Sequence, residues 1–217
     1  MDLSRPLAAV VPSLDGPVLQ AVASTMAPLT GRQVHRIAGV GSEAGVRKVL
    51  ARLVGQGLVR VTEAGPSLLY TANRDHLAWP AVETLTSIRR RLLGQLVELI
   101  AGWDPAPRHL SLFGSAARGD GGVDSDIDLL LLRPDAVAED CEPWAGQVDR
   151  LRERVQAWTG NHCQVFQLDT ARLAQHVAAG DPLIDTWRRD AVTVTGDDPG
   201  TLVREVDRPR RRARVAR

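Results

Sequence analysis

The sequence predicts an α+β protein with two modules joined by a long helix. Apolar residues recur at helical spacing in short segments of residues 14–55 and alternate as in strands directly afterwards. From residue 109 onward, strand-like and helix-like segments alternate, which indicates a mixed-sheet α/β domain. The expected organisation is a first module at 1–75, a linking helix at 76–105, the α/β domain at 106–200, and a basic, disordered tail at 201–217.

The composition is that of an ordinary globular protein. The 217 residues are 44% hydrophobic and 24% charged, with a net charge of +1 that indicates no particular partner. Cys141 and Cys163 are too few for a disulfide framework and suit a reducing compartment. The first residues lack a signal-peptide pattern, and the longest mostly apolar stretch, 92–103, is too short to span a bilayer. We therefore expect a cytoplasmic protein with no membrane partner.

The first module is predicted to contain three helices and a hairpin. Residues 14–26 have apolar side chains at helical spacing. A second helix is expected after the N-cap Thr30, and a third over 42–55 with Ser42 as its N-cap. Residues 59–73 alternate as two short strands around a turn at 63–66.

This order of elements, over residues 12–74, resembles a winged helix-turn-helix of the bacterial regulator type. The resemblance implies that 42–55 is the recognition helix, lying in the major groove of DNA. A single module would bind weakly, so a homodimer is expected if DNA is the partner. The alternative is a module that contacts protein or only packs. The candidate DNA-binding residues are Arg47, Lys48 and Arg52 on the helix and Arg60 on the wing.

The linking segment is predicted to be one helix over 79–103. Leu85, Ile88, Leu92 and Leu96 belong to an apolar stripe at helical spacing, and Pro80 suits the first turn. We expect this helix to pack on both modules.

The α/β domain carries polar residues at the ends of two apolar segments. The strand 109–113 runs directly into Gly114 and Ser115, where free backbone N–H groups and a hydroxyl can bind an anion. The next strand begins at Asp126, and the alternation of a strand places Asp126 and Asp128 on one face. Two carboxylates facing an anion loop are suited to binding Mg²⁺ together with a phosphate group.

The whole motif reads Gly-Ser, two residues, Arg-Gly, five residues, Ser-Asp-x-Asp, over residues 114–128. It resembles the minimal nucleotidyltransferases of the polymerase-beta superfamily, and the resemblance covers about residues 95–196. Such enzymes move a nucleoside monophosphate from a nucleoside triphosphate to a hydroxyl and release pyrophosphate. Asp126 and Asp128 would then be the catalytic, Mg²⁺-binding residues. The nucleotide-binding candidates are Gly114, Ser115, Arg118 and Ser125.

Two of these assignments have alternatives. Arg118 is expected either to contact phosphate or to brace the loop against an acidic residue. A tight turn before the strand also explains Ser125.

The family's third carboxylate is not found where the resemblance places it. In the strand expected at 163–168 that position holds Gln164, which carries no charge and cannot act as a base. Asp169 is the nearest acidic residue, but it lies an odd number of residues after Gln164 and therefore on the opposite face of a regular strand. We expect it instead to cap the following helix. Loss of a positioned base lowers a rate by about a hundred- to ten-thousandfold.

Two functions follow from these residues. The first is a Mg²⁺-dependent nucleotidyltransferase with a DNA-binding winged helix. Its acceptor would be a protein hydroxyl, an RNA end or a small molecule, and a toxin-like protein comes first because enzymes of this type are often antitoxins. The second is a DNA-binding transcriptional regulator whose degenerate transferase domain senses a nucleotide. A pure scaffold would gain nothing from paired acids beside a buried strand.

Overall fold

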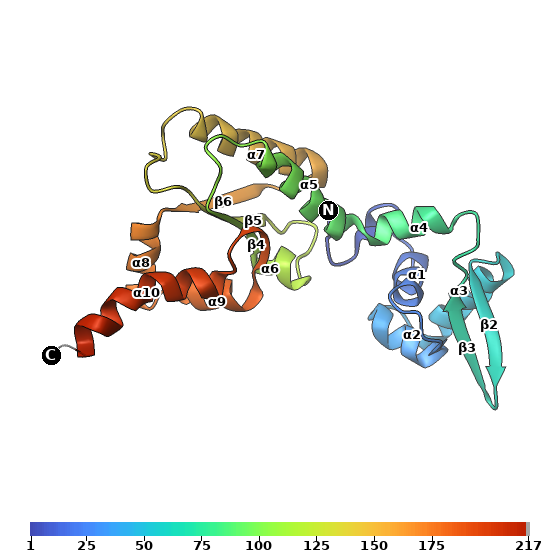
Figure 1. Cartoon of the computed structure of the whole chain (residues 1–217). Coiled ribbons are helices and arrows are strands. Elements are labelled where there is room, and N and C mark those ends of the chain that lie inside the picture. The colour runs from blue at the N-terminus through green and yellow to red at the C-terminus, as the bar shows by residue number, and fades with distance from the viewer. Residues whose placement is uncertain (216–217) are drawn as a thin grey trace. The chain divides into compact units, whose positions relative to one another are not determined.

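A computed structural model describes residues 1–215, with side chains for 1–207, and divides into two compact units (Figure 1). The N-terminal unit comprises Asp2 and residues 4–90. The C-terminal unit comprises Met1, Leu3 and the chain from Arg91 onward. The boundary lies inside the segment predicted as the linking helix. None of the helices in the described part of the chain combines the length and the apolar character needed to cross a membrane.

The N-terminal unit combines short helices with a three-stranded antiparallel sheet of order β1-β3-β2. Its helices are the 3-10 helix η1 (Pro6–Ala9), α1 (Asp15–Ala23), α2 (Gly31–Ala38), α3 (Glu43–Gly55) and α4 (Trp79–Thr86). Its strands are β1 (Leu29–Thr30), β2 (Val59–Ala64) and β3 (Ser67–Ala72).

Local sequence signals set the bounds of α2 and α3. The Thr30 hydroxyl accepts a hydrogen bond from the Gln33 amide, and the Gln33 side chain bonds back to the Thr30 amide. Ser42 caps α3 through the amide of Gly45. The predicted N-caps and the predicted β2–β3 hairpin are confirmed.

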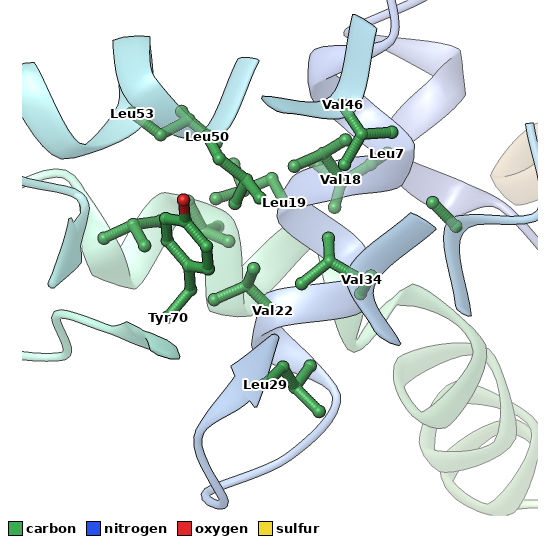
Figure 2. Close-up of a cluster of buried hydrophobic side chains, with 14 of the residues drawn as sticks. Leu7, Val18, Leu19, Val22, Leu29, Val34, Val46, Leu50, Leu53 and Tyr70 are labelled. Atoms are coloured by element: carbon green, nitrogen blue, oxygen red, sulfur yellow. The ribbon is translucent and has the colours of Figure 1, made fainter. Parts of the chain in front are cut away.

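One apolar cluster holds the N-terminal unit together. The buried faces of α1, α2 and α3 meet around Val18, Val34 and Leu50, each fully buried, and Tyr70 of β3 closes the cluster (Figure 2). Burial of each such side chain stabilises the fold by about 1.5–3 kcal/mol. The same cluster includes Trp79 of α4.

One prediction for this unit is wrong in detail, and one strand was missed. The helix expected over 14–26 ends at Ala23, and the Met26 side chain, expected on its apolar stripe, is 77% exposed. The strand β1 was not predicted, because two residues are too few for a visible alternation. Its pairing with β3 is a non-local contact that the local sequence does not encode.

The single helix predicted over 79–103 is also wrong, because the structure has two helices there. After α4 ends, α5 spans Ile88–Ala101. The hydroxyl of Thr86 donates to the carbonyl of Val82, and that of Ser87 donates to the carbonyl of Thr84. Such side-chain bonds compete with the helical backbone pattern and explain the break.

The C-terminal unit is built on a mixed four-stranded sheet of order β6-β5-β4-β7. Strands β5 and β6 are parallel, and the other pairs are antiparallel, which confirms the α+β class and the mixed sheet. The strands are β4 (His109–Phe113), β5 (Ile127–Leu132), β6 (Cys163–Leu168) and β7 (Val192–Gly196).

Helices cover both faces of this sheet. The helices are α6 (Gly114–Arg118), α7 (Trp144–Thr159), α8 (Thr170–Ala179), α9 (Pro182–Asp190) and α10 (Pro199–Val215). The helix α7 lies on one face, and α8, α9 and α10 lie on the other (Figure 1). On the latter face, Leu130 and Leu132 pack with Trp187 of α9, whose indole donates to the Ser111 hydroxyl at 2.7 Å.

The tail predicted to be disordered over 201–217 is helical as far as Val215. Leu202 and Val203 are buried against the core formed with α8 and α9, which gives the helix an apolar face to pack. This long-range packing explains why the arginine-rich composition alone was misleading. Residues 216 and 217 lie outside the described residues.

His109 of β4 is a buried titratable residue next to the sheet's edge strand. Its ring is fully buried, Nδ1 donates to the carbonyl of Asp197 at 2.7 Å, and the ring packs edge-on against Trp187. Burial, partly opposed by that carbonyl, lowers the pKa of His109 from 6.5 to about 4. The neutral form is therefore the folded form.

We expect His109 to make the C-terminal unit less stable as the pH falls from 6.5 to 4. In that range the unfolded chain takes up a proton that the folded chain excludes, which costs up to about 3 kcal/mol of unfolding free energy. Urea denaturation of wild type and His109→Phe at several pH values measures this loss. The variant should show a flatter dependence on pH, and identical slopes would contradict the assignment.

Candidate functional site

The site begins where β4 passes into α6 at Gly114. This glycine has φ +68, in the left-handed region, directly after the extended Phe113. A Cβ placed on Gly114 would lie 2.3 Å from Oδ2 of Asp128, far inside van der Waals contact. The backbone therefore approaches a carboxylate oxygen at a place where only glycine fits.

Asp126 and Asp128 lie at the start of β5. Asp126 directly precedes the strand, one residue outside the predicted boundary, and Asp128 is its second residue. Ile127 between them is buried on the opposite face. Burial, reinforced by the charge of Asp126 and opposed by that of Arg118, raises the pKa of Asp128. A bound cation would relieve this repulsion.

An amide of strand β6 and an imidazole of the residue directly before that strand lie beside the acid pair. Gln164 pairs in register with Asp128, and its Nε2 donates to Oδ2 of Asp126 at 3.1 Å. The Nδ1 atom of His162 lies 3.8 Å from Oδ1 of Asp126. Gln164 was expected here from the sequence, whereas His162 was not, because no metal-ligand spacing marks His162.

The turn before β5 is held by hydrogen bonds from two side chains. The Ser125 hydroxyl accepts from the amide of Gly122 at 2.8 Å, as the tight-turn alternative predicts. The buried amide of Asn161 donates to the carbonyls of Ser125 and Val123 at 2.8 and 3.0 Å. Asn161 was missed, because no local motif links it to a turn 36 residues earlier in the chain.

Ser115, the residue after Gly114, is hydrogen-bonded within the loop through its backbone. The Ser115 carbonyl accepts from the amides of Gly119 and Asp120. A Cβ on Gly121 would lie 3.0 Å from the Ser115 hydroxyl, so this hydroxyl faces the glycine-rich turn.

Arg118 adopts the bracing arrangement of its two expected roles. Its Nε donates to Asp120 at 2.9 Å and its Nη1 to Asp190 of α9 at 3.3 Å. These hydrogen bonds, the one to Asp120 first, raise the pKa of the guanidinium. Asp190 was not identified from the sequence.

Asp169, the nearest acidic residue beyond β6, has the capping role expected for it. Its carboxylate accepts from the amide of Arg172 at 2.8 Å and pairs with Arg133 at 2.5 Å. The predicted N-cap is confirmed, and the carboxylate is engaged away from the acid pair.

The carboxylate oxygens of Asp126 and Asp128 are suited to a hard cation whose other ligands come from a bound phosphate and water. Among the residues that the structure describes, no group of three or more His, Cys, Asp or Glu side chains is arranged to hold a metal ion. Two carboxylates nevertheless fit Mg²⁺, which binds through one or two carboxylates, substrate phosphate oxygens and water. The partly buried, like-charged pair provides such ligands.

The basic residues proposed for DNA contact differ in their surroundings. Arg47 lines a cavity of about 270 Å³ together with Arg32 and Tyr70. Arg52 pairs with Asp15 of α1, and Arg60 pairs with Asp75 at 2.6 Å. Lys48 is exposed on α3.

Comparison with known families finds one similarity, within the C-terminal unit. Residues 95–173 match the model of the nucleotidyltransferase domain family. The matched segment contains β4 to β6 and with them Gly114, Asp126 and Asp128. Residues 95–173 are therefore similar to a nucleotidyltransferase domain, as the motif at 114–128 predicts.

Solved structures show weaker likeness. A crystal structure of a toxin–antitoxin complex with AMP-PNP is 16% identical, with a TM-score of 0.35, covering 58% of this chain and 91% of that chain. A mutant MntA–HpeT toxin–antitoxin structure is 13% identical, with a TM-score of 0.36 and the same coverage. Human N-acetylserotonin methyltransferase with SAM is 21% identical, with a TM-score of 0.28, covering 46% and 30%.

TM-scores of this size do not establish a shared fold. No curated protein matches the chain.

We expect Gly114→Ala to destabilise the C-terminal unit by about 1–3 kcal/mol, because it adds left-handed strain and a clash with Asp128. Gly94→Ala is the matched control: Gly94 lies in α5 with open space around its Cα. That change should stabilise the fold by about 0.5–1 kcal/mol. Urea denaturation measures both, and equal effects of the two changes would contradict the close approach.

Proposed function

We propose that this protein is a Mg²⁺-dependent nucleotidyltransferase that moves a nucleoside monophosphate from a nucleoside triphosphate to a hydroxyl, with a protein as the first candidate acceptor. The observation that carries the proposal is Asp128 against the backbone of Gly114, with Asp126 directly before β5, inside the segment that matches the nucleotidyltransferase family. An anion at the Gly-Ser turn and a cation at the acids would neutralise each other.

The Gly-Ser turn supports binding of the triphosphate. Without a side chain at Gly114, phosphate oxygens can approach backbone N–H groups, and the Ser115 hydroxyl adds a donor beside the loop. Ser125 serves by fixing the turn that leads to Asp126. Arg118 places a positive charge near the Asp128 carboxylate.

Asp126 and Asp128 would hold Mg²⁺, which supplies charge neutralisation for the phosphate oxygens when bound. In the reaction, the acceptor oxygen forms a bond to the α-phosphorus, and the bond from that phosphorus to pyrophosphate breaks. Gln164 cannot take the hydroxyl proton, because an amide is not a base. The chain therefore supports nucleotide binding more fully than proton removal.

Gln164 favours a second candidate function, a DNA-binding regulator that senses a nucleotide without turnover. Its amide donates to Asp126 where the family has a carboxylate, which leaves the acid pair intact but removes one negative charge. Binding would survive this replacement, whereas catalysis would lose its base.

We expect Asp126→Asn and Asp128→Asn each to lower label transfer by about a hundredfold or more, because each removes a metal ligand. Purified wild type and variants are incubated with Mg²⁺, each α-labelled nucleoside triphosphate and extract from the source cells, and labelled protein, RNA and small molecules are separated. Asp124→Asn is the matched control, since Asp124 is an exposed acid in the same turn. It should retain the wild-type rate.

Gln164→Glu separates the two candidate functions. If wild type transfers label and Gln164→Glu is faster, the transferase proposal holds. If wild type binds a nucleoside triphosphate but transfers no label, while Gln164→Glu transfers label, the nucleotide-sensing regulator is the correct function. Absence of both binding and transfer would refute both functions.

The N-terminal unit is proposed to bind DNA as a winged helix, with α3 in the major groove and the β2–β3 hairpin as the wing. The order of α1, α2, α3 and the hairpin supports this proposal. Arg47 and Lys48 are exposed on α3 and are the first candidates for phosphate or base contact. Arg52 and Arg60 would have to exchange an acidic partner for DNA.

We expect Arg47→Ala and Lys48→Ala to weaken binding to the DNA upstream of the protein's own gene, and to lower the salt dependence by about one counterion each if they contact phosphate. Gel shifts at several salt concentrations, with and without Mg²⁺ and a nucleoside triphosphate, measure this effect. Arg5→Ala, the same change of charge away from α3, should behave like wild type. Equal shifts for all three variants would contradict the assignment.

A further inference from the structure

A second group of charged residues lies at the end of α9, beside the acid pair. The Asp190 side chain is only 7% exposed. It accepts from Nε and Nη2 of Arg189 at 2.7 and 2.9 Å and from Nη1 of Arg118 at 3.3 Å. One carboxylate thus orients two guanidinium groups, one from the motif loop and one from a helix more than 70 residues later in the chain.

This arginine pair, Arg118 and Arg189, is close to the proposed triphosphate site. The helix α6, which begins at Gly114, packs against α9. The charge of Arg118 acts on Asp128, and Arg118 and Arg189 repel each other. Arg189 is 67% exposed, so an incoming anion can reach it.

Charge indicates which part of the substrate such a pair would bind. A triphosphate carries more negative charge than one divalent cation neutralises, and the Gly-Ser turn offers only uncharged donors. During transfer, negative charge grows on the departing pyrophosphate, and fixed cations at that end stabilise it. Guanidinium groups match phosphate oxygens with two parallel N–H donors.

We propose that Arg189 joins Arg118, the arginine already expected to contact phosphate, at the pyrophosphate end of the nucleoside triphosphate, with Asp190 as the positioning residue that orients both. This inference rests on the proposed function and adds Arg189 and Asp190 to its substrate site. The α9 helix is then part of the nucleotide site. No chemistry is required of Asp190, since it acts through the two arginines.

The test compares ligands with and without the pyrophosphate end. Isothermal calorimetry measures the affinity of the full-length protein, with Mg²⁺, for the nucleoside triphosphate that wild type binds best, for the matching monophosphate, and for inorganic pyrophosphate. Arg189→Ala should weaken the triphosphate and pyrophosphate about tenfold or more and leave the monophosphate unchanged. Arg188→Ala, an equal charge change one residue earlier, should alter all three less than about twofold.

Asp190→Asn distinguishes positioning from bulk charge. Removal of a negative charge alone would tighten triphosphate binding, whereas loss of orientation should weaken it severalfold, with the monophosphate again unchanged. Circular dichroism verifies that each variant is folded. Tighter binding by Asp190→Asn, or equal losses for Arg188→Ala and Arg189→Ala, would overturn the subsite while leaving the proposed function intact. A wild type that binds no triphosphate would overturn both.

Discussion

The close approach of Gly114 to Asp128 is the constraint on which the rest of the C-terminal unit depends. It arises from strand pairing, because Phe113 lies opposite Asp128 in the β4–β5 register. A shift by one residue would turn Asp128 toward the other face and move every leucine of β5 with it. The buried leucines of the two strands therefore fix the position of the carboxylate against the glycine.

The sequence predicted this part of the site because its residues are neighbours along the chain. Gly114, Asp126 and Asp128 lie within one β-strand–turn–strand segment, and strand alternation alone gives their common face. The caps Thr30, Ser42 and Asp169 were predictable for the same reason, since a cap and its helix are local. In each case only short-range geometry was needed.

Other features depend on contacts between distant segments and were not predictable. The strand β1 exists through its pairing with β3, and α10 is ordered through Leu202 and Val203 packing on the C-terminal core. Around the site, Asn161 and His162 reach the acid pair and its turn from the connection between α7 and β6. Asp190 reaches Arg118 from α9. No local pattern marks any of these residues.

The charges around the acid pair are unequal on its two sides. On the side of α6 and α9, Arg118 is fixed by two carboxylates, which favours an anion held in one orientation. On the side of β6, Gln164 donates to Asp126 and supplies no charge. A carboxylate at Gln164 would raise the local negative charge and oppose binding of a triphosphate while helping to remove a proton. The Gln164 amide adds no negative charge that would oppose triphosphate binding, and it cannot remove the proton. Under the proposed function, Gln164 would therefore favour retention of the nucleotide over speed of transfer.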